Sequence, residues 1–114
     1  MYSFDSAAGR LTEANRSAAP AGSGPRHLAW HPNGNIVYSI NELSNTINTY
    51  AWNPSGVLIA SQLNVSTLPA GFKGNSGAGE ILVDASGKFV YASNRGNDNI
   101  AIFSIDPGKK LCHQ

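Results

Sequence analysis

Apolar and polar residues alternate with a period of two along several short stretches, the pattern of a β-strand with one buried face. Each stretch is five to seven residues long and rich in β-branched and aromatic side chains, which pack well on a pleated surface. No segment of eleven or more residues places apolar side chains at helical spacing. The pattern predicts an all-β protein with little helix, and its clearest strands are 36–40, 46–52, 88–93 and 100–105.

The sequence matches itself, without gaps, at an offset of 53 residues. The matched pairs include Gly34 with Gly87, Tyr38 with Tyr91, Asn41 with Asn94, Ile47 with Ile100 and Tyr50 with Phe103. A weaker match, at offsets of 47 or 48, relates residues 2–5 and 9–11 to residues 50–53 and 56–58. The chain therefore samples three copies of one unit, the first and the last incompletely.

One full unit divides into four strands, 27–31, 36–41, 46–52 and 57–65, joined by tight turns rich in Gly, Asn, Ser and Pro. A repeat of about 40–50 residues with four antiparallel strands is typical of a β-propeller blade. An immunoglobulin-like sandwich does not repeat at such a period. We expect strands three and four of one blade in residues 1–19, a complete blade in 27–66, and strands one to three with the start of the fourth in 80–114.

About two and a half blades cannot close a ring, because propellers close with four to eight. We therefore expect residues 1–114 to be a partial β-propeller: a fragment of a larger protein, a truncated gene product, or a chain that assembles with other copies. Each blade buries its faces only against its neighbours, so open flanks expose apolar sheet to water. Self-association through these open blade edges is a further expectation.

Composition and charge restrict the function classes. Only 13% of residues are charged and the formal net charge is +1, a balance that argues against nucleic acid as a partner. No apolar run approaches the ~18 residues of a membrane span, and no secretory leader is visible, so we expect a cytoplasmic protein without membrane association. The single cysteine, Cys112, argues against a disulfide or zinc framework. His27 and His31 lie on a predicted strand that ends at Pro32, where their spacing does not favour a metal site, and we expect no cofactor.

Several ionisable side chains are expected at one end of the predicted blades, although other charged residues flank turns at the opposite end. In a meander the chain reverses at every turn, so the approach to the first strand and the turn between the second and third share one rim. This parity places five residues on one rim of two adjacent blades: Arg26, His27, Glu42, Glu80 and Arg95. Lys73, in the glycine-rich connection 69–79, is a further cation that could reach an anion there.

The repeat distinguishes these rim positions from packing positions. Packing residues stay alike between copies, as Tyr38 and Tyr91 do, whereas His27 aligns with Glu80 and Glu42 aligns with Arg95. One interpretation is a ligand site at the mouth of the central channel. The alternative is a solvated rim with interblade ion pairs, for example between Glu42 and Arg95.

Three motifs are similar to a known family: Gly-Pro-Arg-His at 24–27, Asn-Glu-Leu at 41–43 and Ser-Asn-Arg-Gly at 93–96. With their flanking residues they closely resemble the lactonase family of seven-bladed propellers, which contains 6-phosphogluconolactonases and carboxy-cis,cis-muconate cyclases. The resemblance implies a seven-bladed ring, with Arg26, Glu42 and Arg95 as active-site residues. A further active-site histidine of the family lies upstream of the first motif, beyond Met1, and we therefore expect weak or no activity from the chain alone.

The resemblance implies a lactone hydrolase that converts 6-phosphogluconolactone to 6-phosphogluconate in the pentose phosphate pathway. Arg26 and Arg95 would hold the anion and stabilise the oxyanion, and Glu42 or His27 would activate water. Glu80 and Lys73 are further substrate-binding candidates. Two alternatives stay open. One is a muconate cyclase, in which the arginines hold substrate carboxylates and Glu42 takes part in proton transfer; the other is a non-catalytic module that binds a protein or small ligand.

Overall fold

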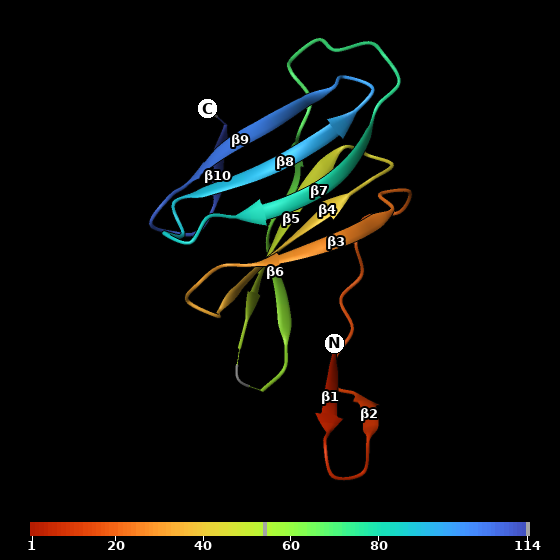
Figure 1. The fold of residues 1–114 in the computed structure, drawn as a ribbon, viewed down its shortest axis with the longest axis vertical. Coiled ribbons are helices and arrows are strands. Elements are labelled where there is room, and N and C mark those ends of the chain that lie inside the picture. The colour runs from red at the N-terminus through yellow and green to blue at the C-terminus, as the bar shows by residue number, and fades with distance from the viewer. Residues whose placement is uncertain (54, 114) are drawn as a thin grey trace.

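A computed structural model describes residues 1–53 and 55–113, and over these residues it contains ten β-strands and no helix (Figure 1). The strands form one two-stranded hairpin and two four-stranded antiparallel sheets. The strands are β1 (Tyr2–Asp5), β2 (Arg10–Glu13), β3 (Pro25–Trp30), β4 (Ile36–Asn41), β5 (Thr46–Trp52), β6 (Leu58–Ser66), β7 (Gly77–Val83), β8 (Phe89–Arg95), β9 (Asn99–Ile105) and β10 (Leu111–His113). This architecture confirms the predicted all-β fold class. Across the described ranges, no helix has the length and apolarity needed to cross a bilayer.

The first four-stranded sheet is a meander in the order β3-β4-β5-β6. Strands β4 and β5 coincide with the predicted 36–41 and 46–52, whereas β3 begins earlier than the predicted 27–31 and β6 is shifted by one residue from 57–65. Asn45, in the turn between β4 and β5, has a φ of 52°, a left-handed value that Asn tolerates better than most residues. The predicted turn 53–56 includes Pro54, which lies outside the described residues.

The second sheet repeats this design with β7 to β10 in sequential order. Asp98 takes the same φ of 52° as Asn45, its counterpart in the repeat, so both copies use the same kind of turn. Strand β7 begins at Gly77, before the predicted start of this unit at residue 80. The short β10 lies where the start of a fourth strand is expected, and Gln114 lies outside the described residues.

The β1–β2 hairpin stands apart from the two sheets, at the end of the molecule marked by the N-terminus in Figure 1. All eight of its strand residues are exposed. The ammonium group of Met1 donates to the carbonyl of Asn15 at 2.9 Å, which ties the chain end back to the segment after β2. The hairpin therefore contributes little to the main core.

The core lies between the facing surfaces of the two four-stranded sheets. Its largest fully buried apolar side chains are Tyr38, Ile40 and Ile47 from the first sheet and Ile81, Val90 and Phe103 from the second. One apolar face of each sheet is covered by the other, which is how adjacent blades stabilise one another.

The aromatic side chains of the two sheets differ in exposure. Tyr38 and Phe103 are fully buried, and Trp30 meets Trp52 edge to face at 5.9 Å between ring centroids. Trp30 nevertheless stays 42% exposed and Tyr91 36% exposed. Tyr91 is partly exposed because it lies on the face of β8 opposite the side occupied by the first sheet.

Polar bridges join the two sheets along the seam between them. The side-chain amide of Gln62 accepts the backbone N–H of Leu111 at 2.8 Å and donates to its carbonyl at 3.1 Å, as a neighbouring strand would. Thr67 Oγ1 donates to Asn94 Oδ1 at 2.6 Å, and Asn94 Nδ2 donates to the carbonyl of Thr67 at 2.7 Å. The seam is therefore fixed by hydrogen bonds as well as by apolar packing.

His31, at the edge of the turn after β3, forms another bridge between the sheets. Its side chain is buried, and its Nδ1 accepts the backbone N–H of Asn33 at 3.1 Å. The proton must then lie on Nε2, which donates to the carbonyl of Gly87 on the second sheet at 3.1 Å. His31 thus connects the two sheets as a neutral imidazole of defined tautomer.

Candidate functional site

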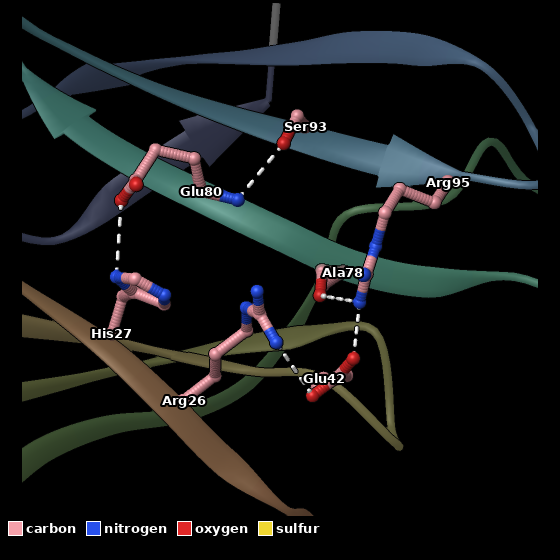
Figure 2. A network of polar contacts seen from close by, with 7 residues as sticks. All are labelled: Arg26, His27, Glu42, Ala78, Glu80, Ser93 and Arg95. Atoms are coloured by element: carbon pink, nitrogen blue, oxygen red, sulfur yellow. Dashed lines mark hydrogen bonds and ion pairs between the residues drawn. The ribbon is translucent and has the colours of Figure 1, made fainter.

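The first strands of the two sheets, β3 and β7, each carry a β-bulge at the same position of the repeat. On β3 the pairing shifts between Pro25 and His27, so Arg26 is the extra residue. On β7 it shifts between Ala78 and Ile81. A bulge breaks the alternation of side chains and re-aims them. The side chains of Arg26 and His27 consequently both extend from β3 toward β7 (Figure 2).

The carboxylate of Glu42 lies between two guanidinium groups. Its Oε2 accepts from Arg26 Nη1 at 3.1 Å, and its Oε1 accepts a short hydrogen bond from Arg95 Nη2. Arg95 Nη2 also donates to the carbonyl of Ala78 at 3.4 Å. The hydrogen bonds from Arg95 and then Arg26 lower the pKa of Glu42 below its usual range. The cluster therefore keeps one ionised carboxylate between two cations that come from different sheets.

The backbone around Glu42 fixes the place of this cluster. The N–H of Glu42 donates to the carbonyl of Gly24 at 2.8 Å, and the N–H of Ala78 on β7 donates to the carbonyl of Glu42 at 3.1 Å. Gly24 has a φ of 64°, and a Cβ there would approach Leu43 to 2.6 Å, so this position requires glycine. The turn that carries Glu42 is thereby attached to both sheets.

A second polar pair lies beside the first on the same rim. His27 Nδ1 is 3.5 Å from Glu80 Oε1, and both side chains are about half exposed. Glu80 is itself fixed, because its backbone N–H donates to Ser93 Oγ at 2.8 Å and its Oε1 accepts the N–H of Ile81 at 2.9 Å. Figure 2 shows His27 facing Glu80 across the space between β3 and β7, and Arg26 facing Glu42, which lies in the turn after β4.

The structure brings together five of the six sequence-predicted site residues, Arg26, His27, Glu42, Glu80 and Arg95. Lys73 lies on the exposed loop between β6 and β7, and among the described residues it forms no hydrogen bond or ion pair. The end of that loop is held near the rim, since Asn45 Nδ2 donates to the carbonyl of Ser76 at 2.8 Å.

The bulges and the supporting contacts of Ser93 and Ala78 escaped sequence reasoning. Strand parity places Arg26 and Glu42 at the same end of a blade, but it puts the neighbours Arg26 and His27 on opposite faces. One signal of the bulges was available in the repeat: two consecutive polar residues, 26–27, align with Gly79-Glu80. Gly79 matters here because a Cβ would approach Ser93 Oγ to 2.8 Å, so glycine leaves room for the Glu80 support.

The arrangement offers three chemical capabilities in one place: two guanidinium groups that suit phosphate or carboxylate, an ionised carboxylate and an imidazole. Within the described ranges, no group of three or more His, Cys, Asp or Glu side chains is placed to hold a metal ion. The chemistry that these residues support is anion binding and proton transfer.

Comparison with known proteins places the fold in a family. The family description "Lactonase, 7-bladed beta-propeller" matches residues 1–114. The 6-phosphogluconolactonase of Bacillus subtilis is 37% identical over 106 residues, which cover 93% of this chain and 30% of that protein.

Solved structures agree with this. A protein from Lactobacillus plantarum superposes with a TM-score of 0.93 at 32% identity, over 99% of this chain and 33% of that one. The periplasmic gluconolactonase of Pseudomonas aeruginosa gives 0.87 at 35% identity, over 98% and 32%. The chain spans about a third of the length of these relatives. It belongs to the lactonase family of seven-bladed β-propellers.

Proposed function

We propose that this chain carries the anion-binding and proton-transfer residues of a lactone-hydrolysing site of the 6-phosphogluconolactonase type. The observation that carries the proposal is the position of Glu42 between Arg26 and Arg95 at the rim where two adjacent sheets meet. The Bacillus subtilis relative, a 6-phosphogluconolactonase, indicates the substrate class, a sugar lactone that bears a phosphate.

The rim chemistry suits such a substrate. Guanidinium groups form paired hydrogen bonds with phosphate, so Arg26 and Arg95 would hold the anion. Attack of water on the lactone carbonyl places negative charge on its oxygen, which an adjacent guanidinium stabilises. Glu42 orients both arginines, and Glu42 or His27 would accept the proton of the attacking water.

The expected level of activity depends on how much of the seven-bladed ring this chain supplies. With about a third of the length of its relatives, the chain would contribute one side of the site. We expect it to bind the phosphate-bearing product and to turn over lactone weakly or not at all. Lys73 would add to anion binding only if its loop closed over the rim.

Binding is tested by titrating the chain with 6-phosphogluconate while recording amide spectra by NMR. We expect shifts at the rim residues, and Arg26→Ala and Arg95→Ala should each weaken binding about tenfold or more, the loss of one charge-assisted contact. Arg16→Ala is the matched control, because Arg16 is an exposed arginine paired with Glu13 on the segment after β2.

A second candidate, a non-catalytic module, is favoured by the ion pairs themselves, because Glu42 already neutralises both arginines across the seam. In that case the three residues would only hold adjacent blades together. Two outcomes would support the non-catalytic module. One is saturable product binding that both arginine variants retain, and the other is a folded chain that does not bind the product. A chain that bound a muconate lactone but no phosphorylated sugar would instead indicate the cyclase activity.

A further inference from the structure

Two rim residues could accept a proton in the proposed reaction, and their surroundings differ. Both carboxylate oxygens of Glu42 are engaged, one by each arginine, and these contacts lower its pKa. A carboxylate stabilised in this way is a weak base. Glu42 is therefore suited to hold the two guanidinium groups in place, and less suited to take a proton from water.

The imidazole of His27 presents the opposite case. Its Nδ1 faces Glu80 at 3.5 Å, and among the described residues Nε2 has no hydrogen bond or ion pair. A carboxylate beside Nδ1 favours the tautomer that carries its proton there. That tautomer leaves the lone pair of Nε2 available, on a side chain that is 44% exposed.

Glu80 is built into the backbone in a way that suits a supporting role. It lies in the bulge of β7, with its N–H bonded to Ser93 Oγ and its Oε1 accepting the N–H of Ile81. The bulge of β3 turns His27 toward it. The charged groups that face the imidazole are thus Glu80 from β7 and, on the same rim, Arg26 with the Glu42–Arg95 pair.

We infer that Glu80 is a positioning residue for His27, and that Nε2 of His27 is the proton acceptor of the rim, with Glu42 as the clamp for the arginines. This inference rests on the proposed function for its substrate. Water gives a proton to Nε2 as its oxygen bonds to the lactone carbonyl carbon. The bond from that carbon to the ring oxygen then breaks, and the ring oxygen takes the proton from Nε2 to become a hydroxyl. The product is the open-chain hydroxy acid.

The first test reads the tautomer of His27 by ¹⁵N NMR of the labelled chain at about pH 8, above the usual imidazole range. We expect the Nδ1–H form in the wild type and the Nε2–H form in Glu80→Ala. His31 is the internal control, since its own partners hold it as the Nε2–H form in both proteins. A wild-type His27 in the Nε2–H form, or a tautomer unchanged in Glu80→Ala with His31 intact, would overturn the positioning role.

The second test measures the lone pair of Nε2 by its reaction with diethyl pyrocarbonate, with the modified residue located by mass spectrometry. The imidazole of His27 should react at least about tenfold faster than that of buried His31. Glu42→Gln should leave the His27 reaction unchanged. Equal or slower reaction of His27 would overturn its role as acceptor.

Neither measurement requires lactone. If the chain failed to bind the product but both His27 measurements gave the expected results, the proposed function would be wrong and the Glu80–His27 arrangement would be supported. Product binding with either result reversed would leave the proposed function and remove this inference.

Discussion

The two four-stranded sheets are copies of one repeat, yet equivalent residues in them have different environments. Ile47 and Tyr38 on the first sheet are fully buried, whereas their counterparts Ile100 and Tyr91 on the second are 63% and 36% exposed. The difference comes from the adjacent sheet. The second sheet covers Ile47 and Tyr38, whereas none of the described residues covers Ile100 and Tyr91 to the same extent. A blade sequence therefore specifies which face is apolar, while an adjacent blade decides whether that face is buried.

The polar positions differ in another way. Both ion pairs that cross the seam, Glu42 with Arg95 and His27 with Glu80, join residues that are equivalent in the repeat, 53 positions apart. Equivalent positions near the innermost strands of adjacent blades face one another, so identical charges there would repel. Divergence at these sites is thus a physical requirement of stacking as well as a source of chemistry.

The strongest test of this comparison is the pair Ile47→Ala and Ile100→Ala. Ile47→Ala should lower the free energy of unfolding by about 2–5 kcal/mol, because it removes buried methyl groups and leaves a cavity between the sheets. Ile100→Ala should change it by less than about 0.5 kcal/mol. Urea unfolding followed by tryptophan fluorescence gives both values. Equal losses would mean that the exposed face of the second sheet is covered in solution.

His31 provides the next test. Its repeat counterpart, Asp84, accepts hydrogen bonds within its own turn from the Ser86 hydroxyl and from the backbone N–H groups of Phe89 and Lys88. The Ser86 hydroxyl, followed by these backbone groups, lowers the pKa of Asp84 to about 2. His31 instead donates across the seam to Gly87. His31→Ala should cost about 1–3 kcal/mol of stability, since the carbonyl of Gly87 loses its donor in a buried place.

The counterpart substitution sharpens this result. His31→Asp should be at least as destabilising as His31→Ala, because a carboxylate cannot donate to a carbonyl. Asn33→Ala is the control, since it keeps the backbone N–H that His31 accepts and removes only the exposed hydrogen bond from the Asn35 N–H to the Asn33 side chain. A harmless His31→Asp in urea unfolding would show that the bridge between sheets contributes nothing.

The exposed face of the second sheet predicts self-association of the chain. Its exposed apolar side chains are Leu82, Tyr91, Ile100 and Ile102. We expect light scattering to report a mass that rises with concentration, and Ile100→Lys to reduce that rise. Leu43→Lys, at an exposed rim position, should leave it unchanged. A monomer at every concentration, with a cooperative melt, would contradict the prediction.

The sequence predicted the strands better than it predicted their bulges and the environment of their side chains. Strands β4 and β5 followed from period-two patterning and turn residues, and the gathering of Arg26, Glu42 and Arg95 followed from strand parity. The bulges of β3 and β7 did not follow, because a single extra residue leaves no trace in a hydrophobic pattern this short. Lys73 was a candidate because it lies in the glycine-rich connection 69–79. Composition does not determine the conformation of such a loop, so the sequence could not predict the contacts of this side chain.

The smallest expected effect is measured at high pH, by comparing the two equivalent tyrosines, Tyr38 and Tyr91. Burial, with a lesser effect from the charge of Asp106, raises the pKa of Tyr38 from 10.0 to about 12. The raised pKa contributes stability that is fully present below pH 10 and lost as the pH rises through about 12, since the unfolded chain releases the phenolic proton first. At neutral pH the contribution does not change with pH. Absorbance at the phenolate band should therefore show one tyrosine that ionises last, and Tyr38→Phe should remove that step while Tyr91→Phe leaves it in place. If the last step disappeared with Tyr91→Phe instead, the assignment of the covered and uncovered faces would be reversed.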